Sequence, residues 1–276
     1  MSDALTPRVD APVTSEAWRP ARPLGLGLLV AVAAFAVLAP WLLGIDPARQ
    51  ALEDSLLAPS LAHPLGTDVL GRSVLARLAH AARLSLGLAL ASALTAALPG
   101  VLLGVLAGWR GGMTDRALSM LADATLSIPG LLLVLLLAAI APGRVGALYA
   151  GLSLVLWVEW FRVARAASRP VLAGHAVQAS RLLGFGRGYL LRRHVLPELA
   201  PLLRTMLALG TAQAVLALAA LGFIGVGVQP PTAELGLMMT EYLPHWHEAP
   251  WLIAAPTGLL TAVVLGMMLV SPDEVA

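Results

Sequence analysis

Polar and basic side chains are concentrated in residues 175–198, which read H-A-V-Q-A-S-R-L-L-G-F-G-R-G-Y-L-L-R-R-H-V-L-P-E. The spacing predicts a short amphipathic helix that glycines end, with Leu196 and Pro197 at the next boundary. Its apolar face is expected to hold Val177, Leu182 and Leu183, with Gln178 and Arg181 elsewhere. Such a helix either inserts into the groove of a partner protein or lies on anionic lipid headgroups. Composition alone leaves both open.

Two acidic side chains lie within otherwise apolar stretches. Asp123 falls about two turns into one stretch, and a charged group at that depth tends to face the protein interior or a water path. Asp123 is therefore a candidate pathway residue. Glu159 precedes Arg162 by three residues, which predicts an ion pair between them near the membrane surface.

Two histidines alternate in the segment H-W-H-E, at His245 and His247. Their imidazoles could offer ligands to a divalent metal ion. Two histidines in a loop do not define a coordination sphere, however. We therefore expect no resident metal site, and we expect this loop to pack against a partner protein.

Two residue types are missing from the sequence. There is no Cys, which excludes thiolate metal sites, disulfides and a cysteine nucleophile. All 18 basic residues are Arg, so the lysine-containing phosphate-binding loop G-x-x-x-x-G-K-[ST] is excluded as well. Any ATP must then be hydrolysed by another chain. The formal charge of +2 gives no indication of nucleic-acid binding. The G-x-S at 151–153 does not predict an intramembrane hydrolase, because none of the predicted spans contains a histidine to act as its base.

The composition places these residues in a bilayer. Hydrophobic residues make up 58% of the chain and charged residues 12%, about half the charged fraction of a soluble domain. Because about 20 apolar residues cross a membrane as a helix, we predict an all-α polytopic membrane protein with six transmembrane helices. The predicted spans are residues 24–43, 84–109, 117–140, 145–161, 202–221 and 251–270.

This pattern divides the chain into a membrane anchor, a polar segment and a core. The first span exceeds the length of a signal-peptide apolar region, which favours a retained anchor. Thirteen arginines then fall on one side and five on the other, which predicts that both termini are cytoplasmic. The predicted parts are the cytoplasmic tail 1–23, the first helix 24–43, an extracytoplasmic segment with a short helix at 44–83, a five-helix core at 84–270 containing the cytoplasmic loop 166–198, and the short cytoplasmic tail 271–276.

Four segments resemble a known family. The basic loop resembles the EAA loop of ABC importer permeases, with matches at Gln178, Ala179, Ser180, Gly184, Val195, Leu196 and Pro197. Three others are similar to segments of the dipeptide, oligopeptide and nickel importer permeases. They are H-P-L-G-T-D-V-L-G-R-S-V-L at 63–75, G-W-R-G-G-M-T-D at 108–115 and F-I-G-V-G-V-Q-P-P-T-A-E-L-G at 223–236. The chain departs from the family pattern at Ser73, Gln178 and Leu235.

The resemblance implies a type I ABC importer permease in a bacterial inner membrane. It implies a related permease subunit as dimer partner, two ATP-binding subunits that hold ATP and Mg, and an extracytoplasmic solute-binding protein. No cofactor is expected on this chain, and the implied solute is a peptide, nickel or a metal chelate. The basic loop would be the coupling helix that docks on an ATP-binding subunit, through Val177, Gln178, Ala179, Ser180, Arg181, Leu182, Leu183, Gly184, Leu196 and Pro197.

One alternative belongs to another class. An ion-coupled secondary transporter needs no ATPase and carries coupling carboxylates deep in several spans. Asp123 is the one candidate that the sequence offers for such a role.

Overall fold

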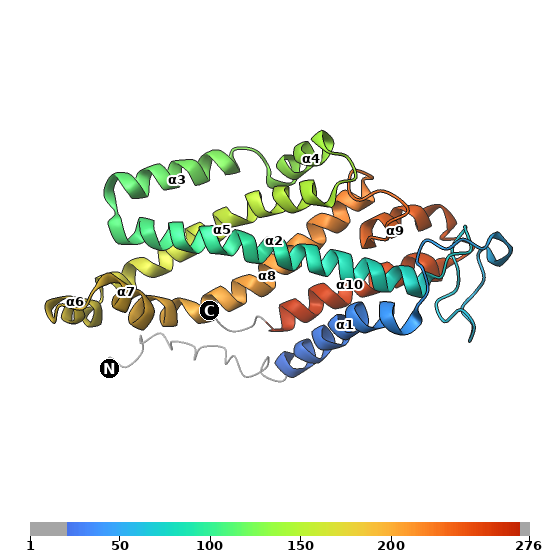
Figure 1. Ribbon diagram of the computed structural model, residues 1–276, viewed down its shortest axis with the longest axis horizontal. Helices are drawn as coiled ribbons and strands as arrows, with labels where there is room; N and C mark the ends of the chain where they lie inside the picture. The colour runs from blue at the N-terminus through green and yellow to red at the C-terminus, as the bar shows by residue number, and fades with distance from the viewer. Residues whose placement is uncertain (1–20, 271–276) are drawn as a thin grey trace, which may run out of the picture.

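Long helices form an elongated bundle in a computed structural model that describes residues 21–270 (Figure 1). Within that range five helices are long and apolar enough to cross a membrane, and a bent pair raises the number to six. The fold-class prediction is confirmed. The five are α1 (Ala21–Leu43), α2 (Val74–Arg110), α5 (Val145–Ala173), α8 (Leu196–Phe223) and α10 (Pro250–Val270). Most of the tail predicted at 1–23 and all of the tail at 271–276 lie outside the described residues.

The bent pair corrects the expectation of one straight span at 117–140. Helix α3 (Gly112–Leu126) and helix α4 (Gly130–Ile140) meet at an angle of 71°. Pro129 lies at the break, where it lacks an amide hydrogen and disfavours helical geometry in the residue before it. This stretch therefore forms two helices joined by a corner.

Helix α2 begins ten residues before the predicted start of its span. Ser73 caps the helix, because its hydroxyl accepts a hydrogen bond from the amide of Ala76 at 3.4 Å. The prediction of a separate short helix at the end of 44–83 is thus wrong, because these residues form the first part of α2. At 37 residues, α2 is about 55 Å long, well beyond a hydrocarbon core of about 30 Å.

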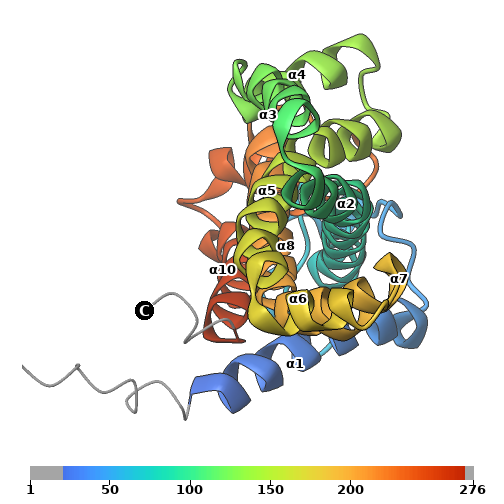
Figure 2. The same ribbon diagram turned by 90° about the vertical axis from the view of Figure 1, so that its left-hand side faces the viewer.

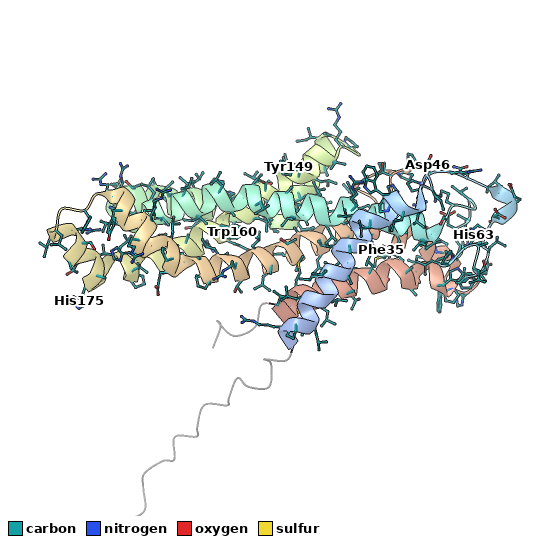
Figure 3. All side chains as sticks on the ribbon, turned by 60° about the horizontal axis from the view of Figure 1, so that its bottom comes forward. Phe35, Asp46, His63, Tyr149, Trp160 and His175 are labelled. Carbon is teal, nitrogen blue, oxygen red and sulfur yellow. The ribbon has the colours of Figure 1, made fainter. Side chains whose placement is uncertain are left out.

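Glycines bring α2 against α5. A Cβ on Gly100 would lie 2.5 Å from the Cβ of Trp160, and one on Gly104 would lie 2.5 Å from the backbone oxygen of Phe161. Small residues at this spacing let two helix backbones approach closely. Trp160 is labelled midway along the bundle in Figure 3.

Helix α1 packs along α10 on one side of the bundle. A Cβ on Gly25 would lie 2.7 Å from Leu269, and one on Gly266 would lie 2.9 Å from Leu29. The predicted anchor at 24–43 coincides with α1, whose outward leucines and valines are exposed.

Shorter helices gather at the two ends of the bundle, which His63 and His175 mark in Figure 3. We call one the knuckle end. It holds α6 (His175–Leu182), α7 (Arg187–Leu190) and the π-helical segment η3 (Leu191–Val195), seen in front in Figure 2. The other, the loop end, holds residues 44–73 with η2 (Leu52–Asp54), then α9 (Leu235–Tyr242) and η4 (Leu243–His245). The stretch before α10, expected to be a loop, is thus partly helical.

Candidate functional site

A Schellman motif ends α6 at the knuckle. Gly184 has a φ of +82°, the left-handed geometry that glycine adopts without steric cost. The amide of Phe185 donates to the carbonyl of Ser180 at 3.1 Å, and the amide of Gly184 donates to that of Arg181 at 3.0 Å. The glycine that matches the EAA pattern therefore reverses the chain after the short helix.

The predicted apolar face of this helix is wrong. Val177 is 1% exposed, whereas Leu182 and Leu183 are 90% and 76% exposed. At about 100° per residue, side chains five and six positions after Val177 point about 140° and 120° away from it. Val177 anchors the helix inward, and the two leucines face outward.

Side-chain contacts fix the short helix of the knuckle in place. The Oγ of Ser180 lies 2.9 Å from the Nε2 of His194, so the histidine helps to hold the short helix in place. The Nε2 of Gln178 donates to the carbonyl of Ala173 at 2.9 Å. The guanidinium of Arg181 stacks over the ring of Trp109 at 5.5 Å, which joins α6 to the last turn of α2.

An exposed apolar surface covers the outer side of the knuckle. We call it the tip patch; it consists of Leu182, Leu183, Phe185 and Tyr189. The rings of Phe185 and Tyr189 stack with centroids 4.2 Å apart. Ala179, Leu196 and Pro197 are also exposed. Clustered apolar side chains on a polar, arginine-rich end of a molecule are typical of a protein interaction site.

A buried charge network lies at the loop end. The Oδ2 of Asp68 is 2.6 Å from the Nε of Arg72 and 3.1 Å from the Nη1 of Arg77. The Oε2 of Glu241 is 2.5 Å from the Nη2 of Arg77 and 3.3 Å from the Nη2 of Arg72. We call these four side chains the charge network. Two cations balance two anions, so the group is neutral where it is buried.

The charge network was missed by sequence reasoning. Asp68 and Arg72 both lie in the 63–75 segment that resembles the family, and their presence there was the available signal. Arg77 is fully buried, which its position in a long apolar helix could have suggested, since a buried guanidinium needs a carboxylate partner. Glu241 lies 164 residues further on, and no local pattern connects it to Arg77.

Glu234 caps α9 from a buried position. One carboxylate oxygen accepts from the amide of Leu237 at 2.9 Å, and the other accepts from the Oγ of Ser85 at 3.2 Å. Burial raises the pKa of the Glu234 carboxyl above its ordinary value, with the hydrogen bonds opposing that rise. A Cβ on Gly222 would lie 2.1 Å from this carboxylate, so the glycine makes room for it.

The acidic residues of the spans pair differently from the prediction. Arg162 donates to the Oδ1 of Asp123 at 2.6 Å across α5 and α3, instead of pairing with Glu159. Glu159 instead accepts a hydrogen bond from the Nε2 of Gln213 on α8, at 3.3 Å. The expected i, i+3 ion pair is therefore wrong, because an aspartate from another helix reaches the arginine. Asp123 is 65% exposed rather than enclosed.

The two loop histidines do not converge. The Nδ1 of His245 lies 4.0 Å from an oxygen of Glu248, and the ring of His247 lies 3.8 Å from that of Trp246. Across residues 21–270, three or more His, Asp or Glu side chains do not come together in a group that could hold a metal ion.

Comparison with known proteins assigns the chain to a family. A family described as binding-protein-dependent transport system inner membrane component matches residues 100–271, which include the knuckle and four of the long helices wholly or in part. The chain belongs to this family. The permease is a membrane component of an ABC importer and a multi-pass inner-membrane protein. Neither the family nor the relatives give support to an ion-coupled secondary transporter.

Three relatives carry peptide-transport names. The permease is 40% identical over 255 residues to the dipeptide transport system permease protein DppC of Escherichia coli (strain K12), covering 89% of this chain and 84% of the relative. It is 37% identical over 254 residues to the di/tripeptide transport system permease protein DppC of Pseudomonas aeruginosa (strain UCBPP-PA14), covering 88% and 83%. It is 30% identical over 247 residues to the oligopeptide transport system permease protein OppC of Bacillus subtilis (strain 168), covering 90% and 81%.

Proposed function

We propose that this permease forms half of a membrane path for peptides and is driven by separate ATP-binding subunits that dock on its knuckle end. The tip patch is the observation on which this proposal rests. It presents apolar side chains at the extreme end of a bundle whose long helices continue beyond a bilayer. A related permease subunit completes the path, and an extracytoplasmic solute-binding protein delivers the solute.

In this proposal the knuckle end faces the cytoplasm. Its helices carry a cluster of arginines, and positively charged residues concentrate on the cytoplasmic side of membrane proteins. The cluster is Arg181, Arg187, Arg192 and Arg193. The loop end then faces outward, where a solute-binding protein would dock, and both termini lie in the cytoplasm. ATP and Mg belong to the partner subunits, because the chain lacks the lysine of a phosphate-binding loop.

Docking would use the outward side of α6. Leu182 and Leu183 fit an apolar groove, while Gly184 fixes the chain reversal that presents them. Gln178 carries an amide where the family pattern has Glu, and its side chain is bound to the carbonyl of Ala173. Binding of the ATP-binding subunit would therefore depend on apolar contacts and not on an ion pair made by residue 178.

The test places a charge in the tip patch. In the complex of both permease subunits and both ATP-binding subunits, Leu183→Asp should weaken co-purification of the ATP-binding subunits. We expect a loss of about 30-fold in affinity, because a central apolar anchor contributes about 2 kcal/mol or more. Peptide-stimulated ATPase activity should fall with it.

The matched control is Leu52→Asp, an exposed leucine at the loop end. It should leave co-purification of the ATP-binding subunits unchanged, and both variants should insert in the membrane at native levels. Native co-purification and ATPase stimulation in Leu183→Asp would refute the docking proposal.

We propose peptides as the solute because the relatives are named for dipeptides, di/tripeptides and oligopeptides. Nickel and metal chelates stay predictions from the resemblance. Uptake into proteoliposomes that contain the complete complex and its binding protein, measured for dialanine, for Ni²⁺ and for chelated Ni²⁺, separates these solutes. Uptake of Ni²⁺ without dialanine uptake would overturn the peptide assignment.

A further inference from the structure

We propose that Glu159 and Gln213 line the water-filled solute path near the middle of the membrane, where the Glu159 carboxylate attracts the cationic amino group of a passing peptide. The inference rests on the proposed function. It adds which face of the molecule lines the path and how that face interacts with the solute. Both residues lie on helices that cross the membrane, α5 and α8.

Both side chains lie far from the ends of their helices. Glu159 is the midpoint of the 29-residue α5, with 14 residues, or about 21 Å, on either side. Gln213 lies ten residues, or about 15 Å, before the end of α8 at the loop end. A hydrocarbon core is about 30 Å thick, so this depth is close to its centre.

Both side chains are exposed on the surface of the chain. Within residues 21–270, the Nε2 of Gln213 is the one donor that hydrogen-bonds the carboxylate of Glu159, at 3.3 Å. A single neutral amide does not compensate a carboxylate for the loss of its hydration, and charged groups in membrane spans face the protein interior or water. The surface shared by α5 and α8 at this level therefore does not face lipid tails.

Neighbouring groups mark the same face as polar. One turn along α5, Arg162 pairs with Asp123 of α3, and both side chains are more than half exposed. The break at 127–129, between α3 and α4, adds backbone groups outside helical hydrogen bonding, which membrane proteins tolerate where they meet water or protein. The polar face thus spans α3, α5 and α8.

Helix α2 provides the contrast. It exposes a stripe of leucines spaced four apart and without a charge between them, as expected for a lipid-facing surface. The stripe is Leu90, Leu94, Leu98, Leu102 and Leu106. Polar and apolar surfaces at the same depth are therefore separated on the molecule, and the polar one is the candidate wall of the path.

The chemistry of the pair suits a peptide in transit. The carboxylate attracts a cationic amino terminus, and the amide of Gln213 can donate to or accept from peptide groups. Because both side chains are exposed, water screens the attraction and keeps it weak. A weak contact lets a solute pass and does not hold it.

The first test measures water access in the complete complex. The native chain has no cysteine, so Glu159→Cys, Gln213→Cys and the control Leu98→Cys each introduce a unique thiol. A charged methanethiosulfonate reagent is added to proteoliposomes, and labelling of this chain is followed by mass. Thiols at 159 and 213 should react at least about tenfold faster than the thiol at 98, because water reaches only the first two. Equal rates at all three positions would overturn the inference, and Gln213→Cys tests it even if Glu159→Cys does not assemble.

The second test asks whether the charge acts on the solute. Glu159→Gln should lower the maximal rate of dialanine uptake several-fold while the half-saturating peptide concentration stays native, since the binding protein sets the latter. Glu159→Asp should restore most of the rate. A native rate in Glu159→Gln would overturn the role of the carboxylate.

These outcomes separate the inference from the proposed function. If the native complex shows no ATP-dependent peptide uptake, the proposed function fails. If the native complex transports dialanine but residues 159 and 213 stay unlabelled, only the assignment of this face fails.

Discussion

The two ends of the bundle differ in which side chains are buried and which are exposed. At the loop end, each of the four side chains of the charge network finds an oppositely charged partner within the chain. At the knuckle end, apolar side chains are exposed and have no such cover within the described chain. The charge network at the loop end is therefore satisfied by its own chain, whereas the tip patch at the knuckle end leaves an apolar surface for another protein.

Backbone geometry supports the same contrast. In the segment that wraps the loop end, a Cβ on Gly71 would lie 1.7 Å from the carbonyl oxygen of Ala51, and one on Gly66 would lie 2.4 Å from that of Leu57. Glycines at the knuckle, Gly184, Gly186 and Gly188, have open space around them. One end is closely packed on itself, and the other is not.

The largest expected effect tests how much the charge network stabilises the loop end. Arg77→Met leaves Asp68 and Glu241 with Arg72 as their one remaining cation, and breaking a buried ion pair costs about 3–5 kcal/mol. The midpoint of thermal unfolding in detergent should fall sharply. Arg83→Met removes an exposed arginine from the same helix and should change stability by about 0.5 kcal/mol or less. Equal midpoints for the two variants would show that the network contributes nothing.

A smaller effect tests the geometry of the knuckle end. Gly184→Ala places a side chain at a φ of +82°, which costs about 1–2 kcal/mol. The end of α6 should fray, with faster exchange of the backbone amides at positions 184 and 185 and weaker ATPase stimulation. Gly186 is the matched control, because its φ of −73° and its open surroundings accept alanine. If Gly186→Ala and Gly184→Ala behave alike, the Schellman motif does not position the tip patch.

The smallest effect refines the description of the loop end, where Glu234 is buried without a cation. A raised folded pKa means that the native state holds its proton more tightly than the unfolded chain. Stability should therefore decline as pH rises above the ordinary value of 4.5 towards the folded pKa. Glu234→Gln removes this titration. Its midpoint of thermal unfolding should therefore rise relative to that of the native protein as pH increases through this range. A pH-independent difference would mean that Glu234 stays charged at no cost.

The sequence predicted those features that arise from local patterns. Long apolar runs marked the spans. The EAA-like segment marked the chain reversal at Gly184. Each of these follows from residues close together in the chain.

Features that depend on distant partners escaped prediction. The start of α2 was misplaced because the uncharged run begins only after Arg83, and the partner that lets Arg77 be buried in the helix, Glu241, is supplied by α9. Arg162 had a carboxylate three residues away, yet the fold brings Asp123 closer. The error at Val177 was different, since the register of a helix alone separates it from Leu182 and Leu183.

The length of α2 has a mechanical consequence. Its closest approach to α5 begins at Gly100, which lies ten residues, about 15 Å, from the Arg110 end and 26 residues, about 39 Å, from Val74. A rod that tilts about this point moves its two ends in opposite directions and in a ratio of about 1 to 2.6. A displacement of about 2 Å at the Arg110 end would thus move the Val74 end by about 5 Å, so that a small movement at one membrane surface becomes a larger one at the other.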